Sequence, residues 1–136
     1  MKYLLLVYTL FGLISCAETD SDNGESFVNV SDNGTSFNVK VNYGKYLLDE
    51  TSSKTIKLMK GNTYYFNLSD SSTDNHPFFI STSSSGGNYD DEYISGITNS
   101  RETSGTLTFI VPSNLTSSLY YNCGAHSGMG GVIMIE

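Results

Sequence analysis

Hydrophobic and polar residues alternate along several short segments of the chain. In the first of them, residues 37–43, the odd-numbered positions are Phe, Val, Val and Tyr, and the even-numbered ones are Asn, Lys and Asn. A period of two places all the apolar side chains on one face of an extended strand. This segment therefore predicts a half-buried β-strand with Tyr43 on its inner face. The same alternation recurs at 56–58, 63–68 and 106–111, and shorter apolar runs lie at 77–82, 119–122 and 132–135.

The segments between these runs are rich in turn-forming residues, and no apolar pattern of helical period extends over ten residues. Such a chain predicts an all-β fold, an antiparallel β sandwich of about eight strands. The spacer at 83–103, which is rich in Ser and Gly, is too long for a hairpin turn. It predicts an excursion of the chain between two strands.

The N-terminal residues have a different pattern. Met1 and Lys2 precede an apolar run at 3–14, which is shorter than the roughly 20 residues of a membrane span but fits the apolar core of a signal peptide. The run ends in Leu-Ile-Ser-Cys16, which resembles a bacterial lipobox and implies a lipid on Cys16 after removal of residues 1–15. An ordinary secretory signal cleaved near Ala17 is the alternative. Both interpretations predict a domain outside the cytoplasm, in the periplasm or at the cell surface.

Residues 16–34 are polar and contain Ser-Asp-Asn-Gly twice, at 21–24 and 31–34. This composition predicts a flexible tether at 16–34 that leads into a single domain at 35–136, with the second Asn-Gly as a candidate hairpin turn.

The chain has two cysteines, Cys16 and Cys123. In an exported protein two cysteines most often pair, which makes a disulfide between them one hypothesis. A lipid on Cys16 excludes that disulfide and leaves Cys123 as a lone thiol. Such a thiol persists in an oxidising compartment when it is buried or bound to a metal.

The charge is acidic, with 7 basic and 14 acidic residues and a formal net charge of −7. Removal of the signal segment takes away one lysine and makes the net charge −8. Such a surface repels phosphate backbones, so we expect no nucleic acid partner, and any protein partner should be cationic. The sequence also has no glycine-rich phosphate loop, nucleophile elbow or His-Glu-x-x-His helix, and two histidines are too few for a trinuclear copper centre or a His-rich hydrolase site.

One motif near the C-terminus carries distinctive chemistry. Cys123, His126 and Met129 follow one another at intervals of three residues. Thiolate, imidazole and thioether are soft or borderline ligands, and with a second imidazole they form the site that suits copper in both oxidation states. The only other histidine, His76, precedes the apolar run at 77–82, where a sandwich fold could bring it to the C-terminal loop.

These residues resemble the cupredoxins, the type 1 blue copper proteins, and the resemblance extends over most of the chain from residue 37 onward. The ligand spacing after the cysteine is similar to that of amicyanin and shorter than that of plastocyanin. The sequence differs from the family pattern at Pro77, where asparagine usually follows the first histidine. The resemblance implies a Greek-key sandwich and one copper ion held by His76, Cys123, His126 and, as the axial ligand, Met129.

The function implied by this resemblance is electron transfer without an enzymatic reaction. We expect a lipid-anchored, extracytoplasmic copper protein that shuttles single electrons between redox partners, with a cationic protein such as a cytochrome as one of them. His126 lies among small residues and is the expected electron port. The alternatives are a module that binds or delivers copper without redox cycling, and an adhesive sandwich without metal. Zinc is a weaker candidate because thioether is a poor zinc ligand.

The acidic run at 89–93 permits three interpretations. It is a docking patch for a cationic partner, a solvated loop, or a calcium site built from Asp90, Asp91 and Glu92.

Overall fold

Ten short strands form most of the regular structure of residues 35–136, the part of the chain that this computed structural model describes. The predicted signal peptide at 1–15, the predicted tether at 16–34 and the predicted lipid attachment at Cys16 lie outside the described residues. None of the helices among residues 35–136 has the length and apolar character needed to cross a membrane.

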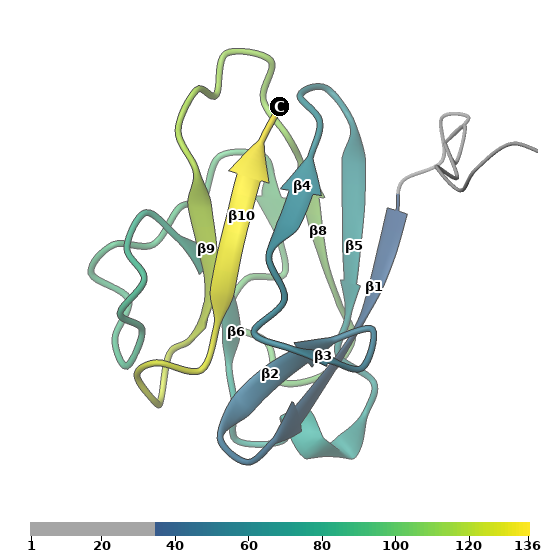
Figure 1. Ribbon diagram of the computed structural model, residues 1–136, viewed down its shortest axis with the longest axis vertical. Coiled ribbons are helices and arrows are strands. Elements are labelled where there is room, and N and C mark those ends of the chain that lie inside the picture. The colour runs from purple at the N-terminus through teal and green to yellow at the C-terminus, as the bar shows by residue number, and fades with distance from the viewer. Residues whose placement is uncertain (1–34) are drawn as a thin grey trace, which may run out of the picture.

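The strands form two sheets that pack face to face (Figure 1). The first sheet has the order β3-β2-β1-β5-β8-β7, with the bounds β3 Thr51–Ser52, β2 Lys45–Leu48, β1 Thr35–Asn42, β5 Thr63–Asn67, β8 Thr106–Ile110 and β7 Ile97–Thr98. The second has the order β4-β10-β9-β6, with the bounds β4 Ile56–Leu58, β10 Gly131–Ile135, β9 Leu119–Cys123 and β6 Phe78–Ser81. A single 3₁₀ turn, η1 (Ser71–Thr73), precedes β6 among the described residues.

The predicted all-β sandwich is confirmed, with ten strands rather than about eight. Most neighbouring strands are antiparallel, as predicted, but β1 pairs with β5 and β10 pairs with β4 in parallel. The members of each pair are not consecutive in the chain, which passes through the opposite sheet between them, as β4 between β1 and β5 and as β5, β7 and β8 between β4 and β10. A parallel pair requires such a crossover connection, whereas a hairpin can join only antiparallel strands.

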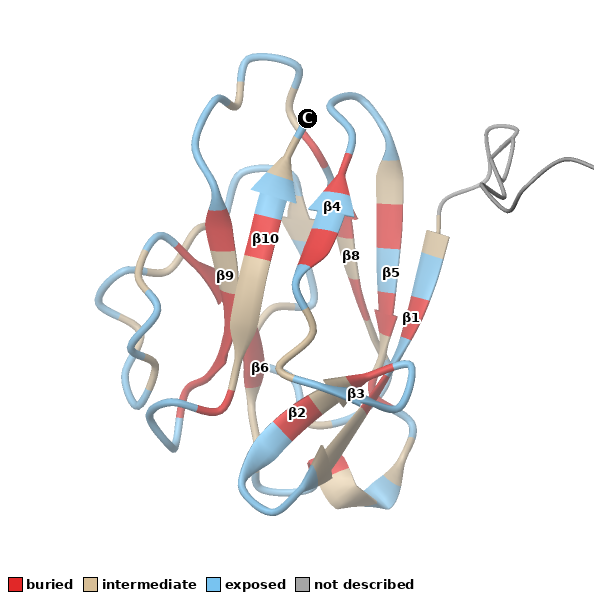
Figure 2. Cartoon of the chain, in the orientation of Figure 1, coloured by how far each residue is buried: buried red, intermediate tan, exposed pale blue. Residues whose placement is uncertain are grey.

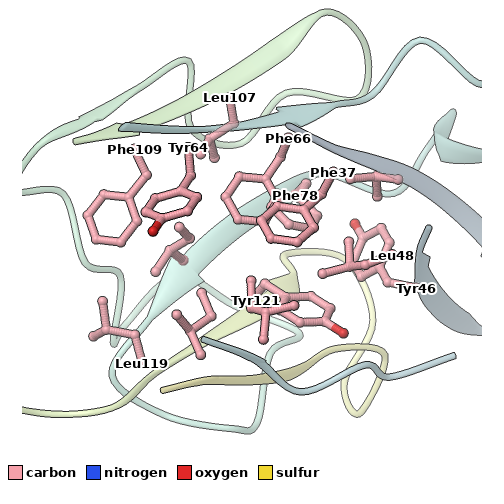
Figure 3. Packing of buried hydrophobic residues seen from close by; sticks show 14 of the residues in the cluster. Phe37, Tyr46, Leu48, Tyr64, Phe66, Phe78, Leu107, Phe109, Leu119 and Tyr121 are labelled. Atoms are coloured by element: carbon pink, nitrogen blue, oxygen red, sulfur yellow. The ribbon is translucent and has the colours of Figure 1, made fainter. Parts of the chain in front are cut away.

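The core lies between the two sheets and follows the predicted alternation. On β5, for example, Tyr64 and Phe66 are buried, whereas Tyr65 faces solvent, and Figure 2 shows the resulting alternation of buried and exposed bands. The aromatic rings in the middle of the core come from both sheets (Figure 3). The ring of Phe78 on β6 lies 5.3 Å from that of Phe66 and stacks on that of Tyr121 at 5.7 Å. The strand that follows His76 is therefore anchored in the centre of the core.

The predicted inner position of Tyr43 is wrong. Its side chain is 97% exposed, because β1 ends at Asn42 and the chain reverses through Tyr43 and Gly44 into β2. Both residues have positive φ angles, 46° and 69°, as a two-residue type I′ hairpin turn requires. The strand alternation resumes on β2, where Tyr46 and Leu48 are fully buried.

Candidate metal centre

His76, Cys123 and His126 come together at one end of the sandwich. Their potential ligand atoms all lie within 4.8 Å of one another. β6 and β9 are antiparallel neighbours, with Phe78 opposite Cys123, and the amide of Gly124 donates to the carbonyl of Pro77 at 2.9 Å. This pairing places His76, two residues before the start of β6, beside the thiol at the end of β9.

The spacing of these side chains fits a metal ion. The sulfur of Cys123 lies 3.9 Å from Nδ1 of His76 and 3.6 Å from Nδ1 of His126. An ion in a trigonal plane, about 2.0–2.1 Å from nitrogen and about 2.3 Å from sulfur, sets sulfur and nitrogen about 3.8 Å apart. The sulfur therefore already lies from each imidazole nitrogen at about the separation that one shared ion requires.

The composition of the group distinguishes between metals. Among residues 35–136, no fourth His, Cys, Asp or Glu joins these three. Structural zinc prefers four such ligands in a tetrahedron, whereas a His₂Cys plane with a weak axial thioether is the set that copper takes in electron-transfer sites. The donor set therefore fits copper better than structural zinc.

The three side chains differ in exposure. Cys123 is a fully buried thiol that forms no disulfide within residues 35–136, His76 is half-buried and His126 is exposed. Burial lowers the pKa of His76, and the nearby charge of His126 lowers it further. A lower pKa keeps the imidazole neutral in more acidic solution, which is the form that binds a metal. Because both rings direct Nδ1 toward the sulfur, a metal bound there leaves Nε2 of each ring to carry the proton.

The long excursion between β6 and β8 packs against the loop that carries His126. The amide of Gly87 donates to the carbonyl of Cys123 at 2.8 Å, and the amide of Gly128 donates to the carbonyl of Ser85 at 2.9 Å. A Cβ on Gly86, whose φ is +67°, would lie 2.9 Å from the carbonyl oxygen of Cys123. The small residues of the excursion thus permit a close backbone approach, and the predicted Ser- and Gly-rich spacer is part of the site's support.

Tyr89 covers the residue after the cysteine, a contact that the sequence did not reveal. Its ring meets the ring of Phe79 edge to face at 5.0 Å, and the guanidinium of Arg101 lies over it at 4.2 Å. A Cβ on Gly124 would lie only 2.1 Å from the Tyr89 ring. The Tyr89 ring therefore occupies the space that any larger residue at position 124 would need.

We expect Gly124→Ala to destabilise the domain by about 1–3 kcal/mol, the usual cost of overpacking a closely packed site. Denaturant unfolding of the copper-free domain measures this loss. In a Tyr89→Ala background the same substitution should cost much less, because the colliding ring is gone. Equal costs in the two backgrounds would show that Tyr89 does not restrict position 124.

Met129, the predicted axial ligand, is buried with only 2% of its surface exposed, and it lies between the His126 loop and β10. Its carbonyl accepts a hydrogen bond from the amide of Tyr46 at 2.8 Å. The Tyr46 hydroxyl in turn donates to the carbonyl of His76 at 2.7 Å. Burial raises the pKa of this hydroxyl far above its usual range, and the nearby Cys123 thiol adds to the rise, so that the hydroxyl remains a donor.

The structure bears on one of the three interpretations of the acidic run, the calcium site. Glu92 is not free, because its carboxylate accepts hydrogen bonds from the Arg101 guanidinium, with Nε at 2.9 Å, and from the Ser100 hydroxyl at 2.7 Å. These bonds, the one from Arg101 first, lower the pKa of the carboxyl group. Within residues 35–136, Asp90, Asp91 and Glu92 do not gather as a metal-binding group. The calcium interpretation therefore finds no support, and Glu92 holds the excursion in place.

No protein-family model matches the chain, and neither does any curated protein. Among solved structures, the copper protein rusticyanin is similar, with 18% identity over 76% of this chain and 80% of its own and a TM-score of 0.48. Rusticyanin from Thiobacillus ferrooxidans has 14% identity over 76% and 79%, with a TM-score of 0.44. A mutant of amicyanin in its reduced state has 14% identity over 79% and 87%, also with a TM-score of 0.44. These values are low, so the chemistry of the site rests on the side chains of this chain.

Proposed function

We propose that residues 35–136 form a copper domain of the cupredoxin type that carries single electrons. The observation that supports this most strongly is the group of one thiol and two imidazoles at metal-binding separations. A copper ion held by this set supplies one electron at a time, because thiolate and imidazole suit both of its oxidation states. The proposed ligands are His76, Cys123, His126 and, on the axial side, Met129.

The protein's part in this function is to keep the donors in place. β6 and β9 hold the segment that follows His76 and the segment that ends in Cys123 in one hydrogen-bonded ladder. The excursion fixes the loop of His126 from the other side through the contacts of Gly87 and Gly128. A site held in this way needs little rearrangement when its charge changes, which favours rapid electron exchange.

His126 is the proposed electron port. Its side chain is exposed, and so are its neighbours Ala125, Ser127 and Gly128, all of which are small. A redox partner can therefore approach the imidazole closely without displacing bulky side chains.

A reductive titration of the copper-loaded domain tests electron transfer. We expect a reversible one-electron change at a stable potential, with copper retained through repeated cycles. Rapid loss of Cu(I) to a chelator after reduction would contradict the electron carrier and would indicate a module that delivers copper.

The axial role of Met129 gives a separate prediction. Met129→Leu conserves volume, so we expect the fold and the visible colour of the copper domain to persist while the reduction potential shifts, because the axial bond is long and weak. Voltammetry of both proteins measures the shift. An unchanged potential would exclude Met129 as a ligand, and complete loss of copper would exclude a type 1 site.

The proposed location is outside the cytoplasm, with a lipid on Cys16 as the membrane anchor, and the proposed partner is a cationic redox protein. The acidic net charge supports the choice of partner. Electron exchange with such a partner should slow as salt rises, since ions screen charges beyond about 10 Å at 0.1 M. A rate independent of salt would contradict electrostatic steering.

Cys16→Ser should release the protein from membranes, and retention there would contradict the lipid anchor.

A further inference from the structure

Tyr46 on β2 forms hydrogen bonds with the backbone of two proposed ligands, His76 and Met129. Its side chain is fully buried, and its ring meets that of Phe78 edge to face at 5.1 Å. Its hydroxyl donates to the carbonyl of His76 at 2.7 Å, and its amide donates to the carbonyl of Met129 at 2.8 Å. One residue of the first sheet thus bonds to two segments that are far apart in the sequence.

The segment around His76 needs such support. His76 lies between η1 and β6, outside any strand, and the preceding Asn75 has a φ of 64°. The amide of His76 donates to the carbonyl of Thr73 at 2.9 Å, and its carbonyl accepts from Tyr46. The backbone of the first imidazole is therefore tied at one end to η1 and at the other to the hydroxyl of Tyr46.

We propose that Tyr46 is a positioning residue of the metal centre, whose hydroxyl fixes the backbone of His76 while its amide fixes that of Met129. This inference rests on the proposed copper function and assigns a role to a residue outside the proposed ligand set. The neighbouring Lys45 supports the same arrangement, because its ammonium group donates to the carbonyl of Gly128, next to Met129. Groups that orient ligands from outside the metal's own shell commonly control its affinity.

The alternative is that the Tyr46 hydroxyl bonds to the carbonyl of His76 only because buried polar groups need hydrogen-bond partners. The chain offers a matched control for this alternative. Tyr121 is also fully buried, and its hydroxyl also donates to a backbone carbonyl, that of Lys54, at 2.8 Å. Lys54 lies between β3 and β4 and belongs to none of the segments that carry the proposed ligands. Tyr46→Phe and Tyr121→Phe therefore each remove one buried bond of nearly equal length, and only the first removes a bond to the site.

The first measurement is copper affinity, by competition with a chelator of known affinity for Cu(I). We expect Tyr46→Phe to weaken binding by about 10- to 100-fold and Tyr121→Phe to change it by less than about 2-fold. The reduction potential and the visible spectrum should also change in Tyr46→Phe alone. Equal losses of affinity in the two variants would overturn the proposal, because the loss would then follow from general destabilisation.

The second measurement needs no metal. In the copper-free domain, amide hydrogen exchange at His76 should be faster in Tyr46→Phe than in the unaltered protein and should be unchanged in Tyr121→Phe. Unchanged exchange at His76 in Tyr46→Phe would overturn the positioning role. If the unaltered domain binds no copper, the proposed function fails, and the exchange measurement still decides whether Tyr46 holds His76 in place.

Discussion

We expect Cys123→Ser to abolish the intense visible absorption of the copper-loaded domain and to weaken copper binding by at least about 100-fold, the upper end of what loss of an outer-shell partner costs. The reason is that Cys123 carries the only thiol within residues 35–136, and a copper-bound thiolate is the proposed ligand able to give strong charge transfer. The hydroxyl of serine is a harder and far less acidic donor, and it does not replace a soft thiolate at this position. Absorption spectra and chelator competition at one equivalent of copper measure both effects.

Cys16→Ser is the matched control for this prediction. It removes the other cysteine of the chain, which lies outside the described residues and outside the proposed ligand set. The variant should keep the visible band and the copper affinity unchanged. Full colour in Cys123→Ser, or loss of colour in Cys16→Ser, would contradict the assignment of Cys123 as the copper thiolate.

The second large effect concerns the core beside the site. Phe78→Ala should destabilise the domain by about 3–5 kcal/mol, because removal of a fully buried aromatic ring leaves a cavity among rings that cannot close around it. Phe78 has no exposed surface, and its ring packs against those of Phe66, Tyr46 and Tyr121. Urea unfolding of the copper-free domain measures the loss.

Ile110→Ala serves as the control, since Ile110 on β8 is 54% exposed. Its change in unfolding free energy should remain within about 0.5 kcal/mol. Phe78 lies two residues after His76, so Phe78→Ala should also bind copper more weakly under conditions in which it is folded. A small loss of stability in Phe78→Ala, comparable to that in Ile110→Ala, would contradict the packing of the two sheets around this ring.

Much of the fold could be predicted from the sequence because a half-buried strand has an apolar residue at every second position. Tyr64 and Phe66 face the core and Tyr65 faces solvent, as the alternation on β5 predicted. The same logic failed at Tyr43, where a hairpin turn extends an apparently regular alternation by one residue. The strand β2 was missed for a related reason, although Gly44 followed by alternation at Tyr46 and Leu48 is a recognisable hairpin signal.

The parallel pairs could not be predicted from periodicity. Alternation tells which face of a strand is buried but not which strand lies beside it. The pairing of β1 with β5 and of β10 with β4 depends on the path of the chain between the two sheets.

The site was predictable where its chemistry lies in local spacing. Cys123 and His126 are three residues apart, and His76 is the only histidine of the chain besides His126. The structure brings these three together, while the axial role of Met129 stays a prediction. Tyr46 and Tyr89 were missed as supports of the site because each contacts it across more than 25 residues of sequence, through a backbone carbonyl or a glycine that leaves no distinctive motif.

The most direct test of the proposed copper site is the absorption spectrum of the unaltered domain during titration with Cu(II). Cys123, His76 and His126 form one pre-arranged donor set. We therefore expect an intense visible thiolate-to-copper band that grows to a maximum at one equivalent and disappears on one-electron reduction. A complex that stays colourless or shows only weak absorption with Cu(II) bound would contradict the type 1 copper site and the electron-transfer function proposed from it.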